Sequence, residues 1–423
     1  MNGQEMYQLC DRLFPICRSI TGEGVRETLR ILQEYLPALN IFEVPSGTSV
    51  FDWEVPKEWN IRDAYIENET GEKIISFKDH NLHVLGYSLP VDTWLTKEEL
   101  LEHIYVEESN PEAIPYVTSY YKERYGFCRT KTMRDHLSCG RYHAVVDSTL
   151  ENGSLTYGEL IIPGDTQEEI LLSTYICHPS MANNELSGPA VMTALADYIN
   201  SLPNKHYTYR ILFIPETIGS ITYLSIHLKE LKEHTKAGFL LSCVGDDRAY
   251  SYIPTRKGNT LSDRVLTNVL NSLHPEFISY SFHDRGSDER QYNAPGVDLP
   301  VCVFCRSKFG AYPEYHTSND NMDLISAEGL VGAFKVMQDV ILALEYNKHY
   351  KVTCLCEPQL GKRGLYPTVS KKGSYDDILT LRDLLAYADG ENDLLEISKQ
   401  TKIPVREFIS HIDKLIAEGL LTV

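Results

Sequence analysis

A histidine directly follows an apolar run in the middle of the chain, and a carboxylate comes next within a short polar loop. The run EEILLSTYIC ends just before His178, and the loop that begins there contains Glu185 and ends in Ser187-Gly188. Imidazole nitrogens and carboxylate oxygens are both common ligands of Zn²⁺. The pattern therefore indicates a metal site, with a purely structural histidine at the end of a strand as the alternative.

A second carboxylate, Glu216, stands just after the apolar run RILFI. An acid at the end of a buried strand loses hydration unless a metal or a hydrogen-bond donor compensates for that loss. One interpretation is a general base for catalysis. The alternative is a carboxylate that interacts with the N-terminal end of the following helix, and the two interpretations are compatible.

Two further loops carry polar side chains of interest. The loop PEYHTSND contains Tyr315, His316 and Asp320. The Asp320 carboxylate either orients the His316 imidazole through a hydrogen bond or belongs to the loop turn alone. The loop GSDERQY contains Asp288 and Arg290, and it either lines a specificity pocket or is a solvated surface loop.

These loops lie in a stretch where short apolar segments alternate with amphipathic ones. The strand-like segments are GELIIPG, EEILLSTYIC, RILFIPE, GFLLSCVGD, ISYSFHD and LPVCVFC, and the helix-like segments include SGPAVMTALADYINSL and SAEGLVGAFKVMQDVILALEY. Such alternation is typical of an α/β fold with a mostly parallel mixed sheet that helices cover on both faces. Ligands bind at the carboxyl ends of such strands, so we expect the loops after Ile176, after Ile214 and near His316 to converge.

Changes in composition along the chain predict three parts. Residues 1–47 and 141–350 are expected to form a discontinuous α/β domain, and residues 48–140, with many aromatic residues and turn signals, an inserted β-rich domain. Residues 351–423 combine a connector with two helices joined by a tight turn and followed by a short strand. That pattern predicts a winged helix-turn-helix.

The second helix of that motif, within Pro404–Lys414, would enter a DNA groove if the motif bound DNA. It offers Arg406 and Lys414 but also Glu407 and Asp413, so its charge is balanced. The formal net charge of −19 also disfavours a nucleic-acid partner, because phosphate binding requires clustered Lys and Arg. Packing or protein contact is the other use of such a motif.

Composition limits the environment of the protein. The sequence has no run of about 18 consecutive apolar residues and no basic N-terminal segment followed by an apolar core, which predicts a cytoplasmic protein without a membrane partner. The ten cysteines are then expected to be reduced thiols. Cys302 and Cys305 form a C-x-x-C within an apolar run, which favours buried apolar side chains over the alternative of a zinc knuckle.

Taken together, the chemistry-bearing loops resemble the zinc exopeptidase superfamily, in the branch of bacterial aminopeptidases and glutaminyl cyclases. The order is similar: a His after a strand, a loop ending in Ser-Gly, a Glu after the next strand, a Ser-Asp segment and then Tyr-His-Thr. The segments RSITGEG, CHPSMANNELSG and PEYHTSND more closely resemble a bacterial family of aminopeptidase-like proteins of polysaccharide biosynthesis. That resemblance covers nearly the whole chain, and it implies an inserted domain and a C-terminal winged helix.

The chain departs from the two-zinc aminopeptidases at three ligand positions. The resemblance places Asn184 at the bridging Asp, Thr217 at the second residue of a Glu-Glu pair, and Ser242 at a further Asp. Loss of these carboxylates removes the negative charge that holds two cations close together. A full two-zinc centre is therefore not expected.

The resemblance then implies a single zinc ion ligated by His178, Glu185 and His316, with an open position for water. Such an ion lowers the pKa of the water and polarises a scissile carbonyl, and Glu216 would be the general base that passes the proton to a leaving amine. Tyr315, Arg290 or Tyr312 could stabilise an oxyanion. Candidates for substrate contacts or for hydrogen bonds to the ligands are Asn184, Asp288, Arg290, Tyr315 and Asp320.

The sequence thus predicts a metal-dependent, aminopeptidase-like hydrolase of an amide or peptide bond, acting on a small peptide-like or amino-acylated substrate. The alternative is a catalytically degenerate exopeptidase fold that serves in binding or assembly in polysaccharide biosynthesis, a context that the resemblance alone implies. Loss of the bridging Asp at Asn184 favours the alternative, whereas retention of His178, Glu216 and His316 favours the hydrolase. A homo-oligomer is compatible with either.

Overall fold

The computed structural model describes residues 1–120, 122–365 and 376–423. The chain divides into two compact units, of which the first contains Met1–Lys257 and Ile278–Phe334 and the second Gly258–Phe277 and Lys335–Val423. Within the described residues, no helix combines the length and the apolar character needed to cross a membrane.

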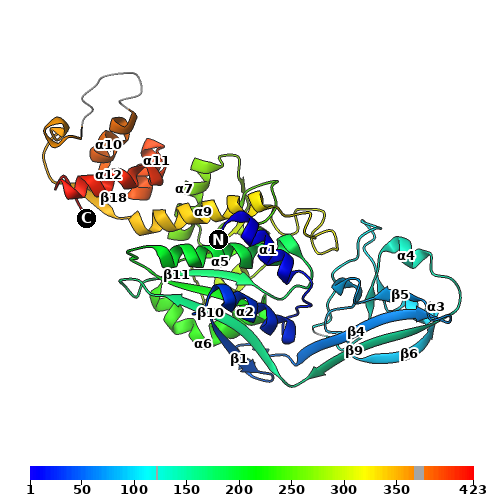
Figure 1. Cartoon of the computed structure of the whole chain (residues 1–423). Helices are drawn as coiled ribbons and strands as arrows, with labels where there is room; N and C mark the ends of the chain where they lie inside the picture. The colour runs from blue at the N-terminus through cyan, green and yellow to red at the C-terminus, as the bar shows by residue number, and fades with distance from the viewer. Residues whose placement is uncertain (121, 366–375) are drawn as a thin grey trace. The chain divides into compact units, whose positions relative to one another are not determined.

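The first unit is built on an eight-stranded mixed sheet (Figure 1). In spatial order its strands are β1 (Asn40–Pro45), β10 (Ser154–Ile162), β12 (Thr208–Ile214), β11 (Glu169–Tyr175), β13 (Thr235–Leu241), β16 (Val301–Cys305), β14 (Ser251–Ile253) and β15 (Ile278–Ser279). The central strands β12, β11, β13 and β16 pair in parallel, whereas β10 and β14 pair antiparallel with the strands beside them in the centre. Because both faces of the centre are covered, these strands are apolar along nearly their whole length. The prediction of a mixed α/β sheet is confirmed.

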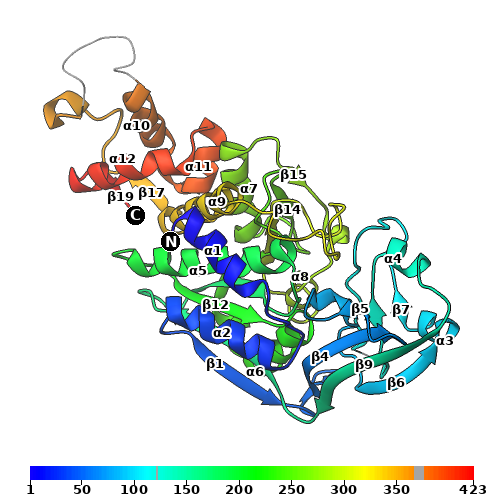
Figure 2. The ribbon, with the colours of Figure 1, turned by 45° about the vertical axis from the view of Figure 1, so that its right-hand side comes forward.

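The helices that follow the central strands lie on opposite faces of the sheet. The chain leaves β11 through α5 (Ser187–Ser201) to reach β12, and leaves β12 through α6 (Ile218–His234) to reach β13 on the other side of β11. Right-handed crossovers in opposite directions place the two helices on opposite faces, as Figures 1 and 2 show. Ligand sites form at such a reversal of direction.

Two N-terminal helices complete the cover of the sheet. The helix α1 (Gly3–Leu13) packs on α5, and α2 (Glu23–Tyr35) packs on β10. The turn before α2 requires glycine, because Gly22 has φ +102° and an added Cβ would lie 2.1 Å from the carbonyl oxygen of Trp59. The RSITGEG segment is thereby held tightly against the inserted part of the chain.

The inserted part of the chain, residues 58–151, is called the inserted module. Its four-stranded antiparallel sheet has the order β5 (Lys73–Ser76), β4 (Glu58–Asn68), β9 (Arg141–Glu151) and β6 (Val91–Thr96). The strand β9, which begins just after the predicted limit at residue 140, pairs with both β4 and β6. The smaller elements of the module are η1 (Asn81–His83), α3 (Lys97–Leu101), β7 (Ile104–Tyr105), β8 (Phe127–Cys128) and α4 (Lys131–Asp135). The short strands β2 (Ser49–Val50) and β3 (Trp53–Glu54) precede it.

The second unit contains the C-terminal helix-turn-helix. Its elements are α7 (Leu261–Leu273), most of α9 (Ala327–Tyr346), β17 (His349–Val352), η4 (Leu360–Arg363), α10 (Asp376–Tyr387), β18 (Asp389–Asp393), α11 (Leu394–Thr401), α12 (Val405–Ala417) and β19 (Leu421–Thr422). The predicted pair of helices is α11 and α12, and a three-stranded sheet of order β18-β17-β19 accompanies them. On α12, Arg406 donates to Asp339 at 3.0 Å, which leaves less positive charge for a phosphate. Part of the predicted connector, residues 366–375, lies outside the described residues.

A buried arginine joins β12 to its neighbours in the first unit. Arg210 is 4% exposed and forms ion pairs with Glu159 on β10, with Glu169 on β11 and with Glu230 on α6, at 2.9, 2.8 and 2.6 Å. Its guanidinium also donates to the hydroxyl of Tyr223 at 2.8 Å. Removing one member of such a network leaves the others charged and unpaired away from water, which is strongly destabilising.

We therefore expect Arg210→Met to lower the free energy of unfolding by about 3–5 kcal/mol, measured by urea denaturation followed by circular dichroism. The matched control is Arg62→Met, which breaks a pair with Asp147 in which the arginine side chain is 69% exposed. That change should have an effect of about 1 kcal/mol or less. Equal effects of the two substitutions would contradict the importance of the buried network.

Candidate metal centre

The parallel pairing of β11 and β12 brings two predicted site residues to one edge of the sheet. Tyr175 and Ile214 are paired at the ends of these strands, so the loops that follow both strands start side by side. As a result, Nε2 of His178 lies 3.6 Å from a carboxylate oxygen of Glu216. The ring of His316 lies with its centroid 5.4 Å from that of His178. The structure therefore brings together His178, Glu216 and His316, the three residues at the centre of the predicted site.

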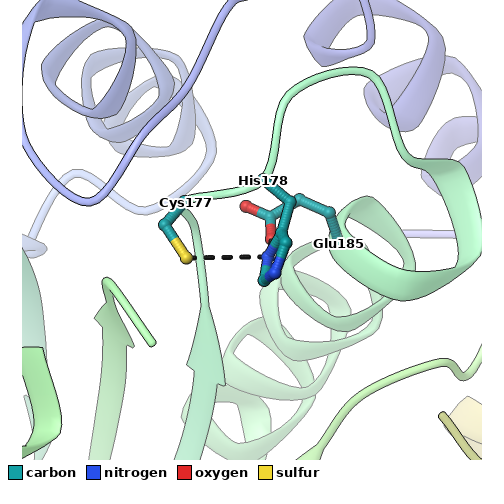
Figure 3. Close-up of side chains that lie close together, drawn as sticks. All are labelled: Cys177, His178 and Glu185. Carbon is teal, nitrogen blue, oxygen red and sulfur yellow. Dashed lines mark hydrogen bonds and ion pairs between the residues drawn. The ribbon is translucent and has the colours of Figure 1, made fainter. Parts of the chain in front are cut away.

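The other ring nitrogen of His178 is occupied by Glu185. Nδ1 lies 2.8 Å from Oε2 of Glu185, and this carboxylate belongs to η2 (Ala182–Leu186), the single turn that precedes α5. Among the described residues, Cys177, His178 and Glu185 have ligand atoms that all lie within 4.8 Å of one another (Figure 3). Since Nδ1 is already bonded, Nε2, on the side of Glu216, is the nitrogen of His178 that remains for a ligand.

The role of Glu185 as a direct zinc ligand stays a prediction, since its carboxylate belongs to the group of Cys177, His178 and Glu185 that could hold a metal ion. In the structure Glu185 has the position of a carboxylate that orients a histidine and fixes its tautomer. The physical reason is the turn of η2, which directs the side chain of Glu185 at the Nδ1 edge of the ring. Burial lowers the pKa of His178, but the adjacent Cys177 and this carboxylate outweigh that effect, so the pKa lies well above its usual value.

Arg18, from the RSITGEG segment, stabilises the Glu185 carboxylate. Its Nε lies 3.5 Å from Oε1 of Glu185, and both side chains are fully buried. The guanidinium also donates to the backbone oxygens of His178 and Leu13 at 3.0 and 2.8 Å. Arg18, Glu185 and His178 therefore form a buried chain of alternating charge that fixes the imidazole. The sequence offered Arg18 only as part of a motif, because its partner lies far along the chain.

Hydrogen bonds fix Glu216 just after the C-terminal end of β12. One carboxylate oxygen accepts from the hydroxyl of Ser287 at 2.5 Å, and the backbone N–H of Glu216 donates to the sulfur of Cys177 at 3.2 Å. The other oxygen faces His178. The side chain is 23% exposed, so this carboxylate is open to a ligand while its orientation is fixed.

The loop that contains Ser287 and Asp288 hydrogen-bonds to Glu216 and to the residue after it. Asp288 is fully buried and accepts from the backbone N–H of Thr217 at 2.7 Å and from the hydroxyl of Ser220 at 2.8 Å. Burial first, and then the nearby charge of Glu216, raises the pKa of Asp288 to about 7. Thr217 has φ +64°, a conformation that a β-branched residue rarely adopts. Arg290, at the rim, donates to the hydroxyl of Thr217 at 3.1 Å.

His316 is also held in a left-handed conformation, with φ +56°. Its Nε2 is buried and has no hydrogen-bond partner, and burial together with the nearby His178 lowers its pKa well below the usual value. Tyr315 stacks on its ring with a centroid distance of 3.9 Å. A buried imidazole held neutral, with one nitrogen unpaired, has the protonation state that a metal requires.

Of the two roles expected for Asp320, the hydrogen bonds of the structure favour a role in the loop over one as partner of the His316 imidazole. Its carboxylate accepts from the backbone N–H groups of Asn183 and Asn184 at 2.6 and 3.0 Å, and from the hydroxyl of Tyr312 at 2.8 Å. The left-handed turn at His316 directs the loop so that Asp320 faces η2. Asp320 therefore positions the turn that carries Glu185.

Tyr116 of the inserted module is a site residue that the sequence analysis missed. Its backbone N–H donates to the carbonyl of His316 at 2.8 Å, and Pro115 pairs with Thr317 in an antiparallel bridge. The Tyr116 ring lies 5.0 Å from that of His316 and 5.3 Å from that of His178, between centroids. The sequence signal was a Tyr-rich stretch, which does not predict contact with a loop about two hundred residues further along the chain. The neighbouring hydrogen bond between Ile114 and Ser318 spans the same two segments.

Neutral groups occupy the positions where further zinc ligands would be expected. The amide of Asn184 donates to the hydroxyl of Tyr175 at 2.7 Å and lies 3.6 Å from the sulfur of Cys243. The hydroxyls of Tyr175 and Ser242 are hydrogen-bonded to each other, and the sulfur of Cys243 lies 3.7 Å from the hydroxyl of Tyr312. Asn184, Tyr175, Ser242 and Cys243 themselves carry no carboxylate, although Tyr312 links them to the carboxylate of Asp320. These four positions therefore lack the charge that a second cation needs.

The donor groups at this edge of the sheet are of the kinds that metal ions use. Four buried polar atoms without a hydrogen-bond partner belong to this region: Nε2 of His316, Oε1 of Glu185, Oδ1 of Asn184 and Oδ2 of Asp288. Unpaired buried polar atoms are destabilising, and a cation would compensate for those that face it. Two imidazole nitrogens with an adjacent carboxylate are chemically suited to Zn²⁺.

The chain matches a known family along most of its length. A family described as a domain of unknown function, DUF4910, matches residues 7–347, and a winged helix-turn-helix family matches residues 348–423. A Clostridium acetobutylicum protein, named as a polysaccharide biosynthesis protein with an aminopeptidase-like domain, is 46% identical over 421 residues, which are 99% of this chain and 96% of the relative.

Solved structures have the same fold. A Clostridium acetobutylicum crystal structure, named as that of a peptidase, superposes with a TM-score of 0.93 at 45% identity, covering 99% of this chain and 96% of that one. A zinc aminopeptidase from Bacillus subtilis superposes with a TM-score of 0.59 at 13% identity, covering 81% of this chain and 94% of that one, a likeness in fold alone. The chain belongs to the DUF4910 family, and it joins an aminopeptidase-like fold to a winged helix-turn-helix domain.

Proposed function

We propose that this protein is a metal-dependent hydrolase of an amide or peptide bond, with a single zinc ion held by His178 and His316. The observation that carries the proposal is the convergence of Nε2 of His178, the unpaired Nε2 of His316 and the Glu216 carboxylate at one edge of the sheet. The aminopeptidase-like fold supports it, although one fold hosts many activities. In this proposal Glu185 either completes the ligand set or orients His178, and Glu216 is kept for proton transfer.

Glu216 acts as the general base in this proposal. Its orientation is fixed by Ser287, and its other oxygen faces His178. In this position it can accept a proton from an attacking water and pass it to the leaving amine. When bound, a zinc ion supplies Lewis-acid polarisation of the scissile carbonyl. Asp288, with its pKa raised to about 7, stabilises the backbone N–H of Thr217 and so the loop that carries the base.

The walls of the site favour a small substrate. Tyr116 and Tyr315 border His316, and Arg290 stands at the rim near Thr217. A peptide-like or amino-acylated molecule could place its carbonyl between His316 and Glu216, with Arg290 or Tyr315 near the oxygen. The name of the Clostridium acetobutylicum relative suggests polysaccharide biosynthesis as the context. We propose no membrane or nucleic-acid partner for this activity.

A second candidate function is binding or assembly by a degenerate exopeptidase fold. The observation that favours it is the neutral network of Asn184, Tyr175, Ser242 and Cys243, which replaces charged ligands. Metal content and substrate turnover distinguish the two functions, because a catalytically inactive site requires neither bound metal nor turnover.

The metal site is tested by the zinc content of protein purified without chelators, measured by mass spectrometry of the element. We expect about one zinc per chain for the wild type and loss of most of it for His316→Ala, because Nε2 of His316 is the buried nitrogen without another partner. The matched control is His283→Ala, which changes an exposed histidine and should keep the metal. A metal-free wild type, or unchanged metal content in His316→Ala, would refute the zinc site.

The role of Glu185 is tested with Glu185→Gln. A glutamine can still accept from Nδ1 of His178 but lacks the charge that Arg18 pairs with. If Glu185 orients the histidine, zinc affinity should fall by about 10–100-fold while one zinc per chain still binds at saturation. Complete loss of binding, measured by competition with a chromogenic chelator, would instead identify Glu185 as a direct ligand.

The chemistry is tested with Glu216→Gln and a panel of aminoacyl and acyl-amide substrates. This variant should keep its folded structure and lose turnover by about 10²–10⁴-fold, because the base can no longer accept a proton. Glu233→Gln, at an exposed position on α6, should have normal turnover. A zinc-loaded wild type that hydrolyses none of the panel would favour the binding function.

A further inference from the structure

The inserted module contains a pocket of about 290 Å³ that is separate from the metal centre. Its polar lining comes from Asn68, Glu72, Arg129, His136, Ser138 and Tyr142. Ile74, Met133 and Leu137 supply an apolar wall. None of the residues assigned to hydrolysis lines it, so the proposed catalytic function leaves this pocket unexplained.

Arg129 carries a buried charge with which no carboxylate of the described residues pairs. The residue is 7% exposed, and two of its guanidinium nitrogens, Nε and Nη1, are buried without a hydrogen-bond partner. Burial lowers its pKa, and the one opposing influence is Tyr142 rather than a carboxylate. An isolated buried cation is unfavourable unless an anion compensates for it.

The other buried arginines show what such a residue normally receives. Arg18 is paired with Glu185 and with backbone carbonyls, and Arg210 with three glutamates. Arg306 donates to the carbonyls of Ala249 and Gly329 at 2.6 and 3.0 Å. Within the described part of the chain, Arg129 differs from these three in having neither kind of acceptor for Nε and Nη1.

We propose that this pocket binds a small molecule through an oxyanion group, a carboxylate or a phosphate, that pairs with Arg129. Arginine is well suited to both groups because its planar guanidinium presents several N–H donors. The hydroxyl of Ser138, which lies 3.3 Å from that of Tyr142, adds a donor to the same lining.

The rest of the pocket restricts the ligand further. Glu72 is exposed and is held by the amide of Asn68 at 2.9 Å, so it would repel an anion at that side and accept from a hydroxyl or amine. The apolar wall of Ile74, Met133 and Leu137 would contact a hydrocarbon part. The ligand therefore has an oxyanion at one end and a hydrogen-bond donor at the other.

The test is thermal denaturation of the full chain at constant ionic strength, with sodium acetate or inorganic phosphate replacing sodium chloride. We expect a saturable rise in melting temperature for the wild type with at least one of the two anions, because a ligand that binds the native state stabilises it by mass action. The anion that acts identifies the preferred group. Arg129→Gln should raise the half-saturating concentration by about tenfold or more.

Arg134→Gln is the matched control, since Arg134 lies in the same module and pairs with Asp135 and Glu108. It should respond to the anion as the wild type does. Phosphate stabilises many proteins by exclusion from their surface, so an equal rise in wild type and Arg129→Gln would overturn the proposal. Absence of a saturable response to both anions in the wild type would overturn it as well.

A second variant, Arg129→Met, tests whether the arginine is required for folding instead of ligand binding. Without added anion, Arg129→Met should melt at the wild-type temperature or above, because it replaces an unpaired buried charge by an apolar chain of similar length. Unfolding of Arg129→Met under conditions where Arg134→Gln is folded would show that the arginine supports the fold, and would refute its assignment to a ligand.

Discussion

The arrangement of the candidate metal centre depends on one buried chain of charges, from Arg18 through Glu185 to His178. Each member is fully or almost fully buried, and each therefore requires its neighbour, because an unpaired charge in the interior is strongly unfavourable. The chain of contacts fixes the imidazole from its Nδ1 side. Nε2 is then left facing Glu216 and His316 at the edge of the sheet.

Several distant segments are constrained by that requirement. The N-terminal RSITGEG segment supplies the guanidinium, and η2 supplies the carboxylate. Asp320 holds η2 through the backbone N–H groups of Asn183 and Asn184. Left-handed conformations at Thr217 and His316 show that the surrounding structure holds the site in place against local preference, as is common where a site must be organised in advance.

The inserted module contributes to the same site and also has a pocket of its own. Tyr116 reaches the two histidines because the segment around Pro115 pairs with the loop after His316. The apolar interiors of the module and of the large sheet form one continuous cluster, which includes Ala64 and Val146 beside Leu171 and Leu240. Binding at the Arg129 pocket would therefore act on a part of the chain that is packed against the fold that carries the metal centre.

The sequence alone determined the α/β fold, the winged helix and the loops that carry His178, Glu216 and His316. These follow from local patterns: apolar periodicity marks strands and helices, and polar residues after parallel strands meet at one edge. Tertiary structure alone decided which partner each polar group takes. Glu185 faces Nδ1 of His178, Asp320 faces η2, and β9 belongs to the inserted module, because these pairings depend on how distant segments pack together, which sequence spacing does not encode.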